Sequence, residues 1–262
     1  MYREVSVKSA GRLYTSCVVE IADGSRVKIS CRERRRFGRG AQTMIEKSPW
    51  DLRSRDGREV LLGDLVVIFN SDDDACRFVG ELLSITYERV IGEAEKALAN
   101  YLGERSKVLE ILSRLRRSPR STLLSFIDAL KNCQKDPLEC ISEDLLKGWR
   151  STYSGFSEKL RNIISGVSED ISGKILSAVY LIASLQLKIY EGDSATASKI
   201  LDLIESEHGY SVDRAVVGRI ASQQDYRGAD EFLMTTISNI FNRIKISIYM
   251  RYGCRPSESG LL

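Results

Sequence analysis

An arginine-rich segment is the part of the sequence whose residue types best suit binding chemistry. Residues 32–40 hold five arginines and two glycines around one aromatic residue. Guanidinium groups grip phosphate through paired hydrogen bonds, and glycine lets the backbone approach a ligand closely. An aromatic ring beside arginines also suits a stacked base. The segment predicts an anion-binding site formed by Arg32, Arg34, Arg35, Arg36, Phe37 and Arg39.

A solvated loop is the alternative interpretation of the same segment. Its arginines would then pair with acids such as Glu33, Glu46 and Asp51. The distribution of charge favours an anionic partner, because residues 1–60 have a net charge of +6 while the whole chain has +3. A basic N-terminal segment followed by a mildly acidic remainder of the chain indicates that the basic segment binds an anion. Nucleic acid is the first choice, a membrane surface the second and a protein ligand the third.

A second group of arginines follows about 80 residues later, within and after a segment with helical periodicity. It predicts a secondary basic patch that could extend the anion-binding surface. An ordinary solvated helix face is the favoured interpretation, since helices usually turn their charges to solvent. The patch consists of Arg114, Arg116, Arg117 and Arg120.

No set of residues in the sequence suits catalysis, and no cofactor or metal site is predicted. A Ser–His–acid set, a glycine-rich phosphate loop and an H-E-x-x-H motif are all missing. The single histidine, His208, and six cysteines without a C-x-x-C pair make a zinc site improbable. The acids Asp72–Asp74 are explained by the start of a helix. These observations predict a non-enzymatic binding or adaptor protein, with an enzyme as the less favoured class.

The first 69 residues must position the arginine segment, and they read as short strands. Alternating apolar residues over 2–8, 13–21 and 25–32 predict strands, and further short strands extend to Phe69. A three-residue loop at residues 22–24 would pair Ile21 with Ser25 and keep the apolar residues on one face. That pairing sets Cys17 diagonal to Cys31, which argues against a disulfide between them.

The N-terminus lacks the apolar core of a signal peptide. The most apolar run, Lys174 to Tyr190, is too short and too polar to cross a bilayer. We therefore expect a cytoplasmic protein with reduced thiols and no transmembrane segment.

After Phe69 the apolar period changes from two to 3.6 residues. A helix cap at Ser71 or Asp72 precedes an amphipathic pattern that continues to about Leu102. This predicts one long helix of roughly 45 Å, at 1.5 Å per residue, with Gly92 as the candidate for a kink. The long helix would close the β module and enter the helical part, so the two halves are expected to be rigidly joined.

The end of the first module resembles that of a pleckstrin-homology-like module. The matching residues are the strand Val66–Phe69, the acidic cap Asp72–Asp74, Phe78 and Leu82–Leu83. The resemblance covers residues 1–86 and implies a bent seven-strand barrel with one mouth plugged by a helix, acting as a docking platform. It does not carry the family's lipid chemistry, because the loop at residues 8–12 holds only two cations. Other small barrels, including the oligonucleotide-binding one, fit the strands nearly as well.

The rest of the chain shows only helical periodicity. The predicted fold class is α+β: a small antiparallel β-barrel or bent sheet capped by a long helix, followed by an all-α helical bundle. The expected segments are the β module at 1–86, the continuing helix at 87–103, the helical domain at 104–254 and a flexible tail at 255–262.

The sequence leaves open which partner the helical domain binds and whether residues 195–222 bind DNA. The helical domain predicts a protein partner, and a membrane-surface or docking scaffold that self-associates into a homo-oligomer is the alternative function. Residues 195–222 resemble a helix-turn-helix, but the acids in both helices oppose phosphate.

Overall fold

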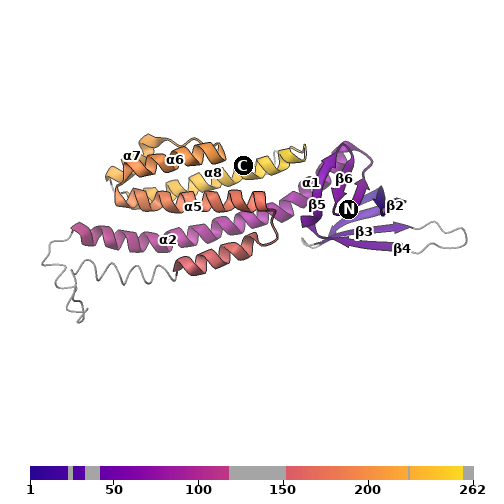
Figure 1. Ribbon diagram of the computed structural model, residues 1–262, viewed down its shortest axis with the longest axis horizontal. Coiled ribbons are helices and arrows are strands. Elements are labelled where there is room, and N and C mark those ends of the chain that lie inside the picture. The colour runs from indigo at the N-terminus through magenta and orange to yellow at the C-terminus, as the bar shows by residue number, and fades with distance from the viewer. Residues whose placement is uncertain (23–25, 33–41, 118–151, 224, 256–262) are drawn as a thin grey trace, which may run out of the picture. The chain divides into compact units, whose positions relative to one another are not determined.

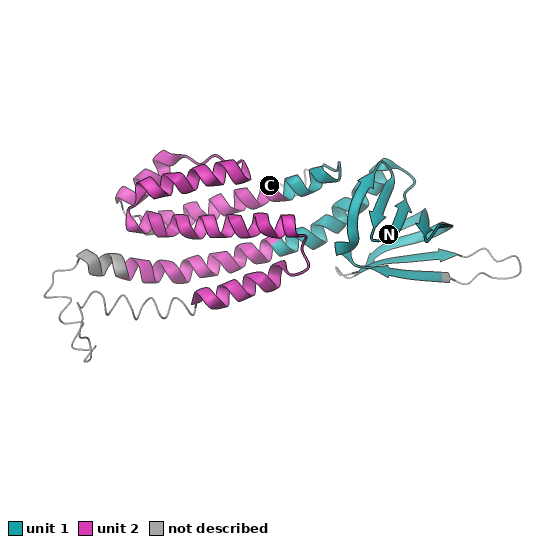
Figure 2. Cartoon of the chain, in the orientation of Figure 1, with its two compact units in different colours: residues 1–90, 245–262 teal, residues 91–244 magenta. Residues whose placement is uncertain are grey.

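The computed structural model describes residues 1–22, 26–32, 42–117, 152–223 and 225–255 (Figure 1). An antiparallel sheet comes first and helices follow, so the predicted α+β class is confirmed. The chain forms two compact units (Figure 2). Unit 1 contains residues 1–90 and 245–262, and unit 2 contains residues 91–244.

The sheet of unit 1 has seven strands, in the order β4-β3-β2-β1-β7-β6-β5. All of its pairs are antiparallel, and β1 pairs with β7, so the first and last strands are neighbours. A short 3₁₀ helix, Pro49–Asp51, links the two edge strands β4 and β5. The strands are β1 (Tyr2–Ser9), β2 (Arg12–Ala22), β3 (Arg26–Arg32), β4 (Gln42–Lys47), β5 (Leu52–Asp56), β6 (Glu59–Leu62) and β7 (Leu65–Ile68).

One face of the sheet is apolar, because every second residue of its strands is buried. Helix α1 (Asp72–Leu83) buries its own apolar face within the same unit, through residues such as Phe78 and Leu82. The Phe78 ring lies 5.1 Å from that of Phe69 and 5.6 Å from that of Tyr2. Each such side chain contributes about 1.5–3 kcal/mol when fully buried.

The register between β2 and β3 differs from the one predicted. Ala22 pairs with Arg26, so Cys17 lies directly opposite Cys31 and the two form a disulfide with Cα atoms 4.1 Å apart. The predicted register was wrong by two residues, and so was the argument against this disulfide. The apolar face was still assigned correctly, since a shift of two residues leaves each side chain on the same face.

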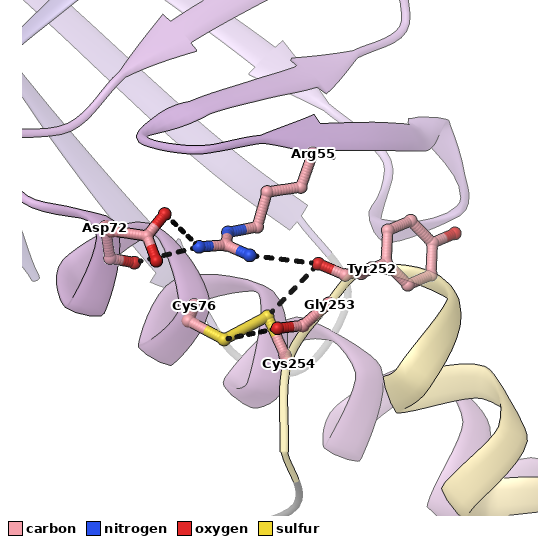
Figure 3. Close-up of a disulfide and its surroundings, with 6 residues drawn as sticks. All are labelled: Arg55, Asp72, Cys76, Tyr252, Gly253 and Cys254. Atoms are coloured by element: carbon pink, nitrogen blue, oxygen red, sulfur yellow. Dashed lines mark hydrogen bonds and ion pairs between the residues drawn. A yellow bond between two sulfur atoms is a disulfide. The ribbon is translucent and has the colours of Figure 1, made fainter.

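The second disulfide joins Cys76 of α1 to Cys254, near the end of the chain. The expectation of reduced thiols is therefore wrong for all four cysteines that the structure describes. Figure 3 shows the surroundings of this bond, where the Arg55 side chain lies between Asp72 and Tyr252. Unit 1 thus contains the last two turns of helix α8 (Tyr226–Arg251) as well as the sheet.

Helical residues run without a break from Asp72 to Arg117. Helix α1 passes into a π-helical turn at Ser84–Glu88 and then into α2 (Arg89–Arg117). The Thr86 hydroxyl donates to the carbonyl of Leu82 within that turn. A side chain that bonds back to the preceding turn disturbs regular α geometry. The irregular turn therefore comes before Gly92, which lies in regular helix.

Unit 2 consists of helices. Beside most of α2 and α8 it contains a helix at residues 152–164, α5 (Glu169–Glu191), α6 (Ser194–His208) and α7 (Arg214–Gln223). Helix α5 is buried around much of its circumference, as its sequence predicted. None of the helices in the described ranges is long and apolar enough to cross a membrane.

A polar network lies inside unit 2. The buried side chain of Gln186 in α5 donates to the Leu102 carbonyl at 3.1 Å and to the Ser106 hydroxyl at 2.9 Å, both in α2. Ser106 in turn donates to the Asp230 carboxylate of α8 at 2.6 Å. Because buried polar groups are costly when unpaired, this network specifies how α2, α5 and α8 align.

Candidate functional site

The arginine segment connects β3 to β4, two neighbouring strands of the sheet. Arg32 is the last residue of β3 and pairs with Gln42, the first residue of β4. The remaining members of the predicted site lie outside the described residues; they are Arg34, Arg35, Arg36, Phe37 and Arg39. The structure therefore fixes the first residue of the segment and the two strands that flank it.

A covalent bond fixes β3 to β2 beside this segment. Cys31, the residue before Arg32, is bonded to Cys17 and is buried. Because side chains alternate along a strand, Cys31 points into the core and Arg32 points to the opposite face. The arginine segment thus starts from a position that the disulfide and the strand pairing both restrain.

The outward face of β3 changes in charge along its length. At its start, Arg26 forms an ion pair with Glu46 of β4, with 2.9 Å between Nη1 and Oε2. Lys28 comes next and lies opposite Glu20 and Glu46. These basic residues therefore have acidic neighbours, and at such exposed sites the pairs contribute little to stability.

The other end of the same face has no acid among its described cross-strand partners. Ser30 lies opposite Val18 and Met44, and Arg32 lies opposite Gln42. Positive charge at this end is thus not balanced across the strands, whereas it is balanced at the start of β3.

Asp51, an acid that could have paired with the arginine segment, has a structural role instead. Its carboxylate accepts a hydrogen bond of 2.9 Å from the backbone N–H of Ser48 and completes the capping box of the 3₁₀ helix. Glu46 is held by Arg26 in the same way. Two of the three acids considered as partners in the solvated-loop interpretation are therefore engaged elsewhere.

Met44 is a surface residue that sequence reasoning did not single out. It is 62% exposed and lies on the outward face of β4, beside Ser30. Its position between Gln42 and Glu46 on one face of a predicted strand was the signal that could have identified it. A large apolar side chain near a basic segment offers a contact for the apolar part of a ligand.

The secondary basic patch belongs to unit 2, whereas the arginine segment belongs to unit 1. Arg114, Arg116 and Arg117 are in the last turns of α2, and their side chains lie outside the described residues, as does Arg120 altogether.

The pair α6–α7 is the predicted helix-turn-helix. Gly209 ends α6 in the left-handed conformation, with φ of 64°. Arg214, one of the side chains that the second helix would present to DNA, forms an ion pair with Asp202 of α6. This pairing weakens the case for phosphate contact, since a free cation is what a phosphate attracts.

Two polar side chains at the start of α1, those of Ser71 and Asp72, have structural partners. No group of three or more His, Cys, Asp or Glu side chains could hold a metal ion in the described parts of the chain. The side chain of Ser71 accepts from the N–H of Asp74 at 3.1 Å, which makes it the N-cap of α1. Asp72 bonds to Arg55.

The surroundings of the only histidine differ from a catalytic triad. Nε2 of His208 lies 3.4 Å from the Ser177 hydroxyl, and that hydroxyl donates to Glu207. In a triad the acid orients the imidazole, whereas here it binds the serine. Burial lowers the pKa of His208.

Scans of known protein families, characterised proteins and solved structures find no match to this chain. Its function is therefore inferred from its own residues.

Proposed function

We propose that the chain is a non-enzymatic binding protein whose β unit binds an anionic partner through the arginine segment at residues 32–39. The observation that carries this proposal is the engagement of Glu46 by Arg26 and of Asp51 by Ser48. Both carboxylates are satisfied within the framework of the sheet. We therefore expect the arginines to bind an external anion, which guanidinium groups hold through charge-assisted hydrogen bonds.

The strands that hold the segment favour tight binding, in addition to the charge of its arginines. The Cys17–Cys31 disulfide and the Arg32–Gln42 pair restrain the first residue of the segment and the strand that follows it before a ligand arrives. Restraint of this kind lowers the conformational entropy that binding must offset.

Nucleic acid is the anion that we favour. The segment combines arginines with Phe37, and Met44 lies exposed on the strand that follows. Cations that track a phosphate backbone, together with apolar side chains that contact bases, are typical of single-strand binding. A membrane surface would be expected to require a broader apolar face than one methionine and one phenylalanine provide.

We also propose that unit 1 is a pleckstrin-homology-like module. Support comes from its seven antiparallel strands, from the pairing of the first strand with the last, and from the amphipathic helix α1 that follows. The common role of such modules as docking platforms agrees with a binding function.

The cytoplasmic location predicted from the sequence has one condition. Disulfides persist mainly in oxidising compartments, with intracellular proteins of hyperthermophiles as the exception. A protein with two disulfides that binds nucleic acid in the cytoplasm belongs to that exceptional setting.

Fluorescence anisotropy with labelled oligonucleotides of about 20 nucleotides, a length that covers a typical single-strand site, tests the proposal. The decisive variant replaces Arg34, Arg35 and Arg36 by glutamine. The matched control replaces Arg114, Arg116 and Arg117 by glutamine and so removes the same charge from the second cluster. We expect steep salt dependence for the wild type, and a slope in log–log form that falls by about 2 in the first variant, at 0.7 for each lost phosphate contact.

Equal binding by the wild type and the Arg34–Arg36 variant would disprove the proposed site. If the control variant alone lost affinity, the anion would bind at the helical unit instead. Binding to anionic vesicles but not to either single- or double-stranded oligonucleotide would identify a membrane surface as the partner.

A further inference from the structure

Unit 2 contains an apolar cavity that the proposed function does not use. The cavity has a volume of about 390 Å³ and lies among α2, α5 and the helix at residues 152–164. Ligand sites in proteins range from about 300 to 1,000 Å³ and are mostly apolar, with a few polar groups that orient the ligand. This cavity has the size and the lining of such a site.

Helix α5 supplies one wall. Tyr180, Ser184 and Leu187 line the cavity together, because residues spaced by three or four lie on one face of a helix. Tyr180 is 40% exposed despite its large ring. Ser184 is exposed as well, so this face of α5 is open to solvent.

Aromatic residues supply the opposite side. Tyr101 of α2 is buried and stacks on Phe156, with 4.4 Å between ring centroids and 11° between ring planes. Tyr153 lies one helical turn before Phe156 and is 42% exposed. Of the stacked pair only Tyr101 lines the cavity, and the stacking on Phe156 restrains its ring, whereas Tyr153 and Tyr180 are exposed lining residues. Exposed aromatic side chains gathered around an apolar hollow are typical of an interaction site.

A cation is built into the same wall. Arg105 follows Tyr101 by one turn of α2, lines the cavity and is only 5% exposed. Its Nη1 donates to the Ala183 carbonyl of α5 at 2.7 Å, and its guanidinium lies 5.8 Å from the centre of the Tyr101 ring. Burial lowers the pKa of Arg105, while Tyr101 and Glu191 oppose that shift.

We propose that this cavity binds a small amphipathic monoanion, with an apolar body against the tyrosines and Leu187 and with its carboxylate or sulfonate beside Arg105. An anion in the cavity offsets part of the desolvation of the guanidinium, so binding and the burial of Arg105 reinforce each other. The interaction does not require Arg105 to lack other partners.

Lys188 does not set the charge preference. It also lines the cavity, but it bonds to Glu191 at 2.7 Å and lies 3.7 Å from Asp193, so its charge is balanced locally. Arg105 is the buried cation of the cavity wall, and the preference for an anion is tested at this residue.

The probe for the experiment is 1-anilinonaphthalene-8-sulfonate, a fluorescent aromatic monoanion. We expect saturable binding to the full-length folded protein at one site. Decanoate should displace the probe, while decanol and decyltrimethylammonium should displace it at least about tenfold less well, the value of one hydrogen bond to a charged group.

Two variants locate the site. Arg105→Met should weaken probe binding about tenfold or more, while Arg219→Met, which removes an exposed cation of the same unit, should not change it. Ser184→Trp should fill the cavity from its exposed side and abolish binding, while Ser206→Trp on the exposed surface of α6 should leave it unchanged. Circular dichroism shows which variants are folded. If Arg105→Met does not fold, the Ser184→Trp variant alone tests whether the probe binds in this cavity.

Three results would overturn the proposal: no saturable binding by the wild type, unchanged binding in the folded Ser184→Trp variant, or equal displacement by decanol and decanoate. All of these readouts concern unit 2, so the proposal stands or fails independently of the arginine segment in unit 1.

Discussion

The guanidinium group of Arg55 in β5 donates a hydrogen bond of 3.1 Å to the backbone carbonyl of Tyr252, which is 197 residues later in the chain. The same side chain donates to the Asp72 carbonyl at 3.3 Å, and only 7% of it is exposed. One buried cation thus connects a strand, the first turn of α1 and the residues after α8 (Figure 3).

Replacing Arg55 by methionine should destabilise unit 1 by about 2 kcal/mol, because it removes the charged donor that bonds to the Tyr252 and Asp72 carbonyls. Hydrogen exchange of residues 245–254 and urea unfolding measure the effect. Arg58→Met, at an exposed position near the end of the same hairpin, is the matched control and should change stability by less than about 0.5 kcal/mol. Equal effects of the two substitutions would show that the Arg55 contacts contribute nothing specific.

The two disulfides should stabilise the protein to different extents. Cys76–Cys254 spans 178 residues and Cys17–Cys31 spans 14. In the chain-entropy model, a loop of the first length contributes more than about 4.7 kcal/mol and one of the second about 3 kcal/mol. We expect Cys254→Ser to lower the unfolding free energy more than Cys31→Ser does. Peptide mapping without reductant should recover both linked pairs, and identical melting with and without reductant would contradict this expectation.

The acids at residues 72–74 should act through the start of α1 and not through catalysis. Ser71→Ala removes the N-cap hydrogen bond to Asp74 and should cost about 1 kcal/mol. Asp73→Ala removes one exposed charge from the first turn and should cost about 0.3–1 kcal/mol through the helix dipole. Thermal melts at low and high salt separate the two effects, since salt screens only the second. A larger loss for Asp73→Ala would contradict the assignment of Ser71 as the cap.

The protein should lose stability through His208 as pH falls. Burial lowers the folded-state pKa of this histidine, so the unfolded chain binds its proton more readily. The stability contributed by the neutral imidazole is fully present above the pKa of His208 in the unfolded chain, about 6.5. It is lost as pH falls through the pKa of His208 in the folded protein. His208→Gln should flatten that part of the stability profile. Because the chain has one histidine, a single imidazole NMR signal reports its pKa, and a midpoint above that of a model peptide would contradict the assignment.

Local patterns in the sequence predicted the strands and helices well. The alternation around Val27 and Ile29 identified the buried face of β3, and the change of period after Phe69 located the start of α1. The register between β2 and β3 could not be chosen this way, because registers that differ by two residues bury the same side chains. The disulfide Cys17–Cys31 depended on that choice.

Contacts between residues far apart in the chain could not be predicted, because they produce no local pattern in the sequence. Cys254 lies beyond the last periodic apolar residue, and nothing local indicates that it meets Cys76 or that Tyr252 meets Arg55. The cavity beside Arg105 was missed for the same reason, since its residues come from three separate helices and each looks like ordinary core or surface in its own segment. The arginine segment could be proposed from the sequence because its residues are contiguous, and as a binding site it stays a prediction.

The Cys76–Cys254 disulfide also determines how the chain would respond to tension. A pull applied at the two termini would pass from residue 76 to residue 254 through the sulfur–sulfur bond, so the intervening stretch would carry no load. All of unit 2 lies within that stretch. In a single-molecule extension experiment, the oxidised chain should lengthen only by the segments outside the two disulfide loops, and addition of reductant should release the helical unit to unfold as a further step.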